Sequence, residues 1–195
     1  MFLARQRGDP HPRPLLGRMR DVRAIEQLKY RYANYCDNGY DPEGIASLFT
    51  SDGIWVVNGV AGDVAGADAS RHHFRELSKA ISWALHFVIA PQVELTRDRQ
   101  SAVGKFYLLC HCTIARTDAP QENDAVVLTL NYVDQFVKQG ERWLFKELRG
   151  TMHQASTWEL GWVKQLRKRD SDGGGMGERG GSKGAGGRVE CSRPP

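Results

Sequence analysis

The sequence predicts an α+β fold in which helices cover one side of a mostly antiparallel sheet. Three observations support this prediction. The first half of the 195-residue chain has helical periodicity, the second half contains four long β-rich stretches, and only short turn sequences separate those stretches. Strands joined by short connections pair as antiparallel hairpins, and helices segregated from such strands form a separate layer. A sheet of long, twisted strands that closes over helices leaves a pocket at its open end.

Three helices and one short strand are expected before the long strands. The first helix starts at the N-cap Asp21, carries a stripe of apolar residues and ends near Asn38. A second, short helix starts at residues 41–43, where Asp-Pro-Glu supplies a cap, a first-turn proline and an acidic side chain. Residues 54–57 are expected to form a short strand, and residues 68–83 a third helix with one apolar face.

The four β-rich stretches are Leu85–Leu95, Ala102–Ala115, Ala125–Lys138 and Trp143–His153. Gln139-Gly140 is the clearest turn between them. In the third stretch apolar side chains alternate onto both faces of the strand, so a monomer would expose one apolar face to water. Exposed apolar faces of this kind usually mark interfaces, and we expect a homodimer or homotrimer.

Both ends of the chain differ from its middle. Residues 1–18 have no periodicity and contain three prolines, and residues 168–195 hold nine of the 21 glycines. Neither segment offers enough apolar surface to offset the entropy lost on ordering, so both are expected to be disordered. The predicted domain therefore covers residues 19–167, and Met1 and Met19 are both candidate starts.

The charge distribution argues against a nucleic-acid partner. The formal net charge is +4, but residues 1–18 account for +3 and residues 168–195 for +2, so residues 19–167 carry −1. A nucleic-acid-binding domain needs a basic face, which this balance does not supply. No stretch is apolar over the 18 residues that a membrane-spanning helix needs, and the four cysteines show no disulfide framework. We therefore expect no nucleic-acid or membrane partner and a reducing, cytoplasmic location.

Asp37 and His86 are the candidate catalytic residues. Asp37 lies at a helix end where the macrodipole disfavours a carboxylate, so either a partner holds it there or it begins an exposed turn. His86 is flanked by large apolar residues, which fits a hydrogen-bonded core histidine or a catalytic base. A carboxylate that accepts one imidazole N–H leaves the other ring nitrogen free to take a proton. Local sequence does not show whether two residues 49 apart meet.

Four sequence stretches carry a family resemblance through their order and spacing. They are residues 24–32 followed by Asp37, residues 48–53 (Leu-Phe-Thr-Ser-Asp-Gly), residues 85–87 (Leu-His-Phe) and residues 161–163 (Gly-Trp-Val). Residues 21–166 thereby resemble a SnoaL-like domain of the nuclear transport factor 2-like superfamily. The most similar branch contains scytalone dehydratase, bile-acid dehydratase and hexachlorocyclohexane dehydrochlorinase. The resemblance implies a cone, in which a strongly curved sheet wraps around N-terminal helices and encloses a deep apolar pocket.

The resemblance also implies an activity and a set of residues. In this branch an Asp–His dyad removes a proton from carbon, and Asp37 and His86 match its positions. The implied function is a cofactor-independent lyase or isomerase, dehydratase-like, that acts on a small apolar, cyclic molecule. Tyr32 resembles a pocket tyrosine that polarises a substrate oxygen. On a regular helix Tyr32 and Asp37 lie about 140° apart, whereas Tyr30 lies within about 20° of Asp37 and is a rival.

Three further residues are expected in the pocket. Trp55 and Trp83 are expected to line its wall, and Cys110 takes the position where the bile-acid enzymes carry an acidic side chain. A thiol is a much weaker acid than a carboxyl group, so this part of the bile-acid site is not reproduced. If Cys110 points inward, His111 points to the opposite face of its strand.

No metal or cofactor is expected. The adjacent residues His72 and His73 point about 100° apart on a helix and have no visible partner ligands, and no glycine-rich phosphate loop follows a strand. The superfamily that the sequence resembles also includes non-catalytic members. These are small-molecule binding modules or structural subunits, such as the β subunit of ring-hydroxylating dioxygenases. Such a binding module or subunit is the alternative function.

Overall fold

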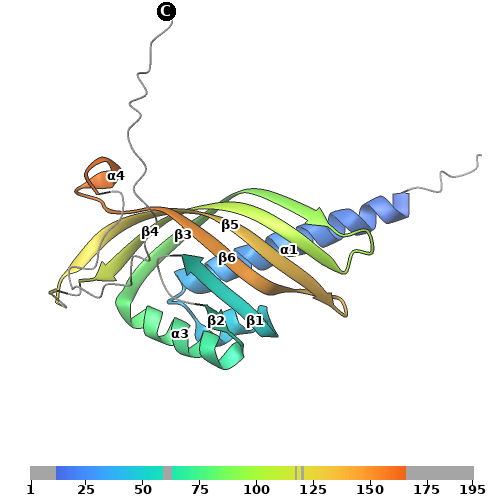
Figure 1. Ribbon diagram of the computed structural model, residues 1–195, viewed down its shortest axis with the longest axis horizontal. Coiled ribbons are helices and arrows are strands. Elements are labelled where there is room, and N and C mark those ends of the chain that lie inside the picture. Colours follow the sequence, from blue (N-terminus) through green and yellow to red (C-terminus); the bar gives the residue numbers. More distant parts are fainter. Residues whose placement is uncertain (1–11, 59–62, 117, 120, 166–195) are drawn as a thin grey trace, which may run out of the picture.

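The computed structural model describes residues 12–58, 63–116, 118–119 and 121–165. The helices within these ranges are α1 (Pro12–Asp37), α2 (Pro42–Ala46), α3 (Ala67–Ala80) and α4 (Gly161–Lys164). The strands are β1 (Phe49–Asn58), β2 (Val64–Ala65), β3 (Ile81–Leu95), β4 (Ser101–Ala115), β5 (Asn123–Gln139) and β6 (Arg142–Thr157). The α+β architecture predicted from the sequence is confirmed, and all four long strands extend beyond their predicted bounds at one or both ends (Figure 1).

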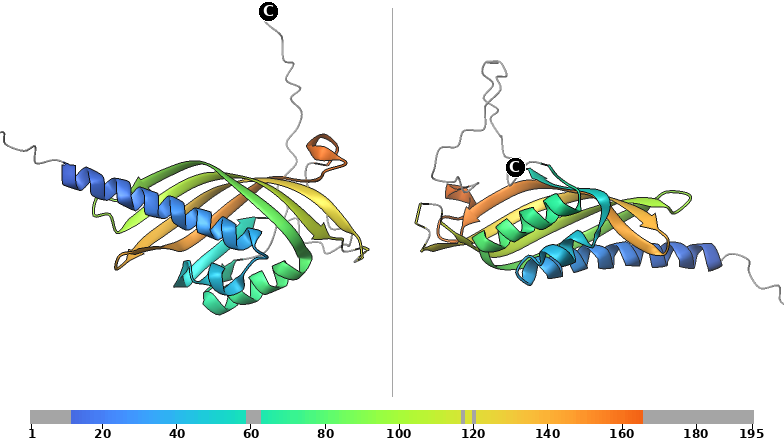
Figure 2. Two further views of the ribbon diagram at one scale, coloured as in Figure 1. Left: turned by 180° about the vertical axis from the view of Figure 1, so that it is seen from behind. Right: turned by 90° about the horizontal axis from the view of Figure 1, so that it is seen from below.

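The strands form one curved sheet in the order β2-β1-β6-β5-β4-β3. The four long strands pair as antiparallel hairpins, as their short connections predict, whereas β1 pairs antiparallel with β2 and parallel with β6. Helices α1, α2 and α3 lie on one side of the sheet, and α1 crosses beneath the long strands (Figure 2). The result is the predicted open cone, a mostly antiparallel sheet that curves around the N-terminal helices.

Helix α1 begins at Pro12, so the prediction of an N-cap at Asp21 is wrong. The carboxylate of Asp21 has tertiary partners instead: it accepts hydrogen bonds from Arg99 Nε at 2.6 Å, Lys138 Nζ at 3.0 Å and Trp143 Nε1 at 3.1 Å. These three partners come from the turn after β3, from β5 and from β6. The hydrogen bonds of Asp21 therefore hold α1 against one end of the sheet.

Helix α1 also extends into the N-terminal segment for which disorder is expected. Residues 12–18, assigned from the sequence to the disordered extension, belong to α1. The remaining parts of the two segments for which disorder is expected, residues 1–11 and 168–195, lie outside the described residues.

Two other element boundaries follow from local chemistry. Asp41 caps α2 as predicted, because its side chain accepts the backbone N–H of Glu43 at 3.1 Å. Helix α3 ends at Ala80, and the chain is already extended at Ile81. Trp83, expected in the last turn of that helix, therefore lies in β3.

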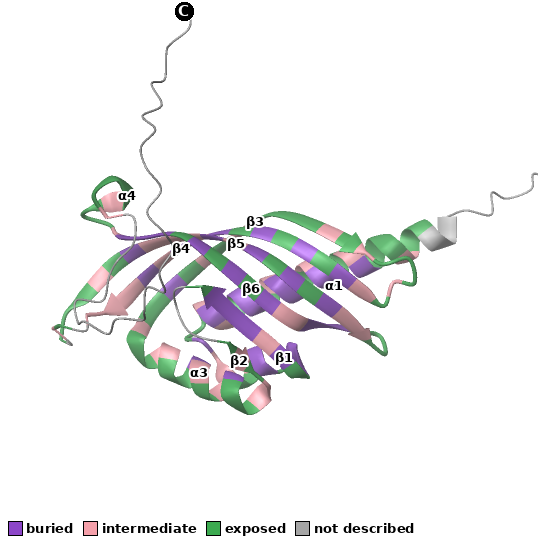
Figure 3. Cartoon of the chain, viewed as in Figure 1, coloured by how far each residue is buried: buried purple, intermediate pink, exposed green. Residues whose placement is uncertain are grey.

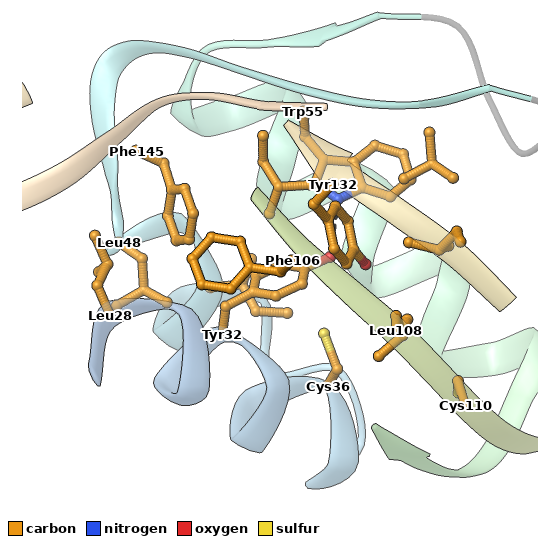
Figure 4. Packing of buried hydrophobic residues seen from close by; sticks show 14 of the residues in the cluster. Leu28, Tyr32, Cys36, Leu48, Trp55, Phe106, Leu108, Cys110, Tyr132 and Phe145 are labelled. Atoms are coloured by element: carbon orange, nitrogen blue, oxygen red, sulfur yellow. Dashed lines mark hydrogen bonds between the residues drawn. The ribbon is translucent and has the colours of Figure 1, made fainter. Parts of the chain in front are cut away.

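The apolar core lies between α1 and the inner face of the sheet (Figure 3). In Figure 4, Tyr32 and Cys36 on α1 face Phe106 and Tyr132, which project from the strands. The opposite face of the sheet carries exposed large apolar side chains, which include Trp83, Leu85, Phe87, Ile89 and Tyr107. In the described part of the chain, no helix is both long enough and apolar enough to cross a bilayer.

Candidate functional site

Asp37 and His86 lie in direct contact. Asp37 is the last residue of α1, and its Oδ1 atom accepts two hydrogen bonds from His86, one from Nδ1 at 2.6 Å and one from the backbone N–H at 2.9 Å. The His86 side chain is 7% exposed and that of Asp37 is 20% exposed. These two donors explain how a carboxylate is held at a helix C-terminus, where the macrodipole opposes it. Because the carboxylate accepts from Nδ1–H, the neutral imidazole presents Nε2 as a proton acceptor.

The chain turns sharply after Asp37, and this turn completes the site. Asn38 donates its side-chain amide to the carbonyl of Asn34 at 2.7 Å, and Gly39 takes a left-handed conformation with φ of +80°. Glycine adopts this conformation at little cost, so it ends the helix. The next residue, Tyr40, is also left-handed and packs its ring edge-on to His86, with ring centroids 6.0 Å apart.

His86 forms part of the wall of a cavity of about 320 Å³. The cavity lies between the sheet and the helices, and its wall is mainly aliphatic and aromatic: Val57, Leu77, Ala80, Ile81, Leu108, Ile114, Val126, Leu128, Leu130, Met152 and Ala155 contribute to it. Polar atoms come from His86, Trp55 and three tyrosines, Tyr32, Tyr40 and Tyr132. Among the described residues that line the cavity there is no aspartate, glutamate, lysine or arginine, so the cavity suits a neutral ligand with few polar groups.

Tyr32 and Trp55 both line this cavity. The indole Nε1–H of Trp55 donates to the hydroxyl oxygen of Tyr32 at 2.9 Å. Burial raises the pKa of Tyr32 well above its ordinary value, so the hydroxyl keeps its proton. The rival Tyr30 is half-buried and is not part of the cavity wall.

The expected angular conflict between Tyr32 and Asp37 does not arise in the structure. Asp37 is the final residue of α1 and does not itself line the cavity. It contacts His86, and it is His86 that reaches the cavity. Tyr32 therefore reaches the cavity from α1, and His86 reaches it from β3.

The structure does not bring Trp83 or Cys110 to the cavity. Trp83 is 52% exposed on the outer face of β3, because side chains alternate along a strand and Ala84 takes the inner face. Cys110 pairs across the sheet with His86 and points inward, but it is fully buried behind the cavity wall. The opposite orientation of His111 is as expected: its ring lies on the outer face, edge-on to Trp158.

Sequence reasoning missed Tyr40 and Tyr132 as cavity residues. Tyr132 had a usable signal, because it shares the alternation of Leu130 and Phe136 along β5, which places it on the inner face. Tyr40 had none, since its position depends on the left-handed turn after α1. The alternation also places Asp134 inward, where it is fully buried.

His72 and His73 lie next to each other on α3. Among the described residues, no group of three or more His, Cys, Asp or Glu side chains could hold a metal ion. The His73 ring packs instead against Trp55, with ring centroids 4.5 Å apart, and burial lowers its pKa.

Solved structures of low sequence identity have the same fold. A type 2 hexachlorocyclohexane dehydrochlorinase, LinA, matches with a TM-score of 0.65 and 17% identity, over 73% of this chain and 91% of that chain. A protein of unknown function from Mycobacterium tuberculosis matches with a TM-score of 0.60 and 20% identity, over 72% of this chain and 76% of the other. An NTF2-like protein with a cystatin-like fold from Novosphingobium aromaticivorans matches with a TM-score of 0.55 and 19% identity, over 74% and 92%.

The family assignment comes from the sequence. No curated protein is similar enough in sequence to match the chain. The model of the SnoaL-like domain matches residues 17–149, which is more than half of the chain. This match shows that the chain belongs to the SnoaL-like domain family.

Proposed function

We propose that the protein is a cofactor-independent lyase or isomerase in which Asp37 and His86 form the catalytic dyad. The observation that carries this proposal is the 2.6 Å contact between Asp37 Oδ1 and His86 Nδ1 at the wall of an apolar cavity. In that arrangement the neutral imidazole presents Nε2 as a base, and the carboxylate stabilises the imidazolium that forms.

In the proposed reaction His86 Nε2 takes a proton from a substrate carbon. The electron pair of the broken C–H bond forms a carbon–carbon double bond as a leaving group departs with its own bonding pair. In an isomerisation, the electrons move toward a neighbouring carbonyl and the proton returns at another carbon. The protonated hydroxyl of Tyr32 polarises the substrate oxygen, and Trp55 packs against the ring.

The proposed substrate is a small, neutral, cyclic molecule. The cavity volume of about 320 Å³ accommodates a single ring or two fused rings. The lining residues that the structure describes offer no charged partner for an ionised substrate. The similar fold of a hexachlorocyclohexane dehydrochlorinase, whose name specifies a chlorinated cyclohexane, supports a ring of this size. The proposed chemistry uses the imidazole of His86 and the hydroxyl of Tyr32 and requires neither a metal nor a cofactor.

The alternative is a non-catalytic binding module or a structural subunit that resembles a ring-hydroxylating dioxygenase β subunit. The observation that favours it is the row of exposed apolar side chains on β3, with Trp83 52% and Ile89 48% exposed, which suits an assembly surface. In either case we propose a cytoplasmic homodimer or homotrimer joined through this outer face.

Proton abstraction can be tested before the natural substrate is identified. A thermal-shift screen of neutral cyclic ketones would select ligands, and NMR in heavy water would follow exchange of their α-hydrogens for deuterium. Asp37→Asn and His86→Gln are expected to slow the exchange by about 100- to 10,000-fold while the ligand still binds. His153→Gln, an exposed histidine on the other face of the sheet, is the matched control and should exchange at the wild-type rate. Equal exchange rates in all four proteins would refute the dyad and favour the binding module.

A further inference from the structure

A second acid–base pair lies near the cavity but is sealed from it. The Lys29 Nζ atom on α1 donates to Asp134 Oδ2 on β5 at 2.8 Å, and both side chains are 0% exposed. Asp134 also accepts the backbone N–H of Arg149 through its other oxygen at 3.2 Å. Burying two charges costs several kcal/mol for each ion before their attraction is counted. An apolar pair would fill this space at a lower cost in desolvation, so the presence of the ion pair calls for an explanation.

The Lys29 ammonium lies against the ring of Tyr132. Its Nζ atom is 3.1 Å from the ring centroid, much closer than the 5.3–5.8 Å to the rings of Tyr32, Phe106 and Phe145. Tyr132 is therefore the aromatic partner of the buried cation. Asp134, two residues along the same strand, fixes the position of that cation.

Tyr132 also belongs to the cavity wall, and its hydroxyl is unused. No described residue forms a hydrogen bond with this hydroxyl. Its oxygen is also not one of the inaccessible polar atoms that lack a partner, so it is open to the cavity. The Tyr32 hydroxyl differs, since it accepts the indole N–H of Trp55. In Figure 4 the Tyr132 side chain lies between Trp55 and Tyr32. A polar atom open to an apolar cavity is available to a ligand.

The chemistry of this arrangement favours hydrogen-bond donation. A cation on the face of an aromatic ring attracts its π electrons, which draws electron density away from the phenolic oxygen and strengthens its O–H as a donor. Burial raises the pKa of Tyr132 well above its ordinary value, so the hydroxyl keeps its proton. Tyr132 is therefore suited to donate to a ligand and not to act as a base.

We propose that the Tyr132 hydroxyl donates a hydrogen bond to an acceptor oxygen on the cyclic ligand, and that Lys29 and Asp134 are positioning residues that hold a cation against its ring. The ligand is then a neutral ring compound with at least one oxygen acceptor, such as a ketone. This inference rests on the proposed function only where it concerns turnover of the ligand. The hydrogen bond from Tyr132 to the ligand does not depend on whether His86 removes a proton.

The test compares a ketone with its hydrocarbon in the full-length protein. α-Tetralone carries one carbonyl on two fused rings, and tetralin has the same rings without oxygen. Tyr132→Phe removes only the hydroxyl, and we expect α-tetralone to bind about three- to ten-fold more weakly while tetralin binds equally well. The infrared carbonyl stretch of bound α-tetralone should lie at lower frequency in the wild type than in the variant. Tyr107→Phe, an exposed tyrosine on the outer face of β4, is the matched control and should change neither value.

The positioning role has its own variant. Lys29→Met combined with Asp134→Leu replaces the ion pair with apolar side chains, and we expect the carbonyl stretch to move toward the Tyr132→Phe value. An unchanged stretch in that double variant would overturn the role of the pair. An equal loss of both ligands in Tyr132→Phe, an unchanged carbonyl stretch, or failure of both compounds to bind the wild type would overturn the role of Tyr132. If the stretch shifts as expected but His86→Gln exchanges α-hydrogens normally, the Tyr132 contact stands and only the proposed reaction fails.

Discussion

Two of the acid–base pairs that connect α1 to the sheet differ in their access to the cavity. Asp37–His86 joins the end of α1 to β3 and leaves its side chains 20% and 7% exposed, whereas Lys29–Asp134 joins the middle of α1 to β5 and is fully sealed. Only the first pair reaches the cavity wall, through His86. The second pair can act only through a neighbouring ring or on the stability of the fold. Access, and not charge, therefore separates the proposed catalytic pair from the proposed positioning pair.

The largest expected effect concerns the accessible pair. The double variant Asp37→Asn with His86→Gln should exchange α-hydrogens only slightly more slowly than either single variant, because groups that act as a unit are not additive. The free energy of unfolding should change by no more than about 1–2 kcal/mol, since the pair is partly exposed. Exchange rates and urea unfolding of the three variants measure both quantities. Multiplying effects in the double variant would show that the two residues act separately.

For the sealed pair the expected effect is on stability. Asp134→Ala leaves the Lys29 cation buried without its partner and should lower the free energy of unfolding by about 3–5 kcal/mol. Replacing both residues, as Lys29→Met with Asp134→Leu, should recover most of that loss. Urea unfolding followed by circular dichroism gives the comparison. A double variant as unstable as Asp134→Ala would mean that the pair itself is a net source of stability.

The sealed pair should also give stability a pH dependence. Burial raises the pKa of Asp134 to about 6, even though Lys29 lowers it. The folded state then holds a proton that the unfolded state releases, so this group makes the protein less stable as pH rises from about 4 to about 6. The contribution should be absent from the Lys29→Met with Asp134→Leu variant. The difference between the two unfolding curves across this pH range measures it.

A smaller effect is expected at Asp21, a buried carboxylate on α1. Burial alone would raise its pKa, but hydrogen bonds from Trp143, Lys138 and Arg99 outweigh burial, and the pKa is lowered. A lowered pKa adds stability above the ordinary value of 3.8, and this stability is lost as pH falls through the folded-state pKa. Asp21→Asn should cost about 1–3 kcal/mol at neutral pH and less in acid. A constant cost at every pH would contradict this account.

The smallest effect on stability is expected on the outer face of the sheet. Phe87→Ser with Ile89→Ser removes two exposed apolar side chains and should change the monomer's stability by less than about 1 kcal/mol. It should nevertheless shift the protein from oligomer to monomer, because that face is the proposed interface. Sedimentation of the wild type and the variant at several concentrations gives the result. A wild type that is monomeric at every concentration would refute the interface.

Period-two patterns made the sheet predictable from the sequence. Alternation along β5 assigns Leu130 and Phe136 to the inner face and Val133 to the outer face, and each lies where this alternation requires. The contact between Asp37 and His86 was expected from two weak local signals and a family resemblance. Local patterns carry this much because alternation and capping depend only on neighbours in sequence.

The sealed pair could not be predicted, because its energetics depend on residues far apart in sequence. A lysine within a helix is usually solvent-exposed, and nothing near Lys29 shows that its partner lies 105 residues later. The prediction that Trp83 lies in the third helix was wrong for a related reason. The predicted helix extended three residues beyond the end of α3, and such an error decides whether the Trp83 side chain faces inward or outward. The N-terminal part of α1 was missed because proline and arginine gave it no apolar stripe.

The contact between Asp37 and His86 also closes a loop. Residues 38–85 connect Asp37 to His86, which are in contact, and this segment contains α2, β1, β2 and α3. The entropy of closing a loop grows only with the logarithm of its length, so a doubling costs about 0.6 kcal/mol. Insertions or deletions within residues 38–85 should therefore reshape the wall that Trp55 and Leu77 provide while the contact between Asp37 and His86 keeps its geometry. This fold can change the size of its cavity without rebuilding the pair of residues proposed to do the chemistry.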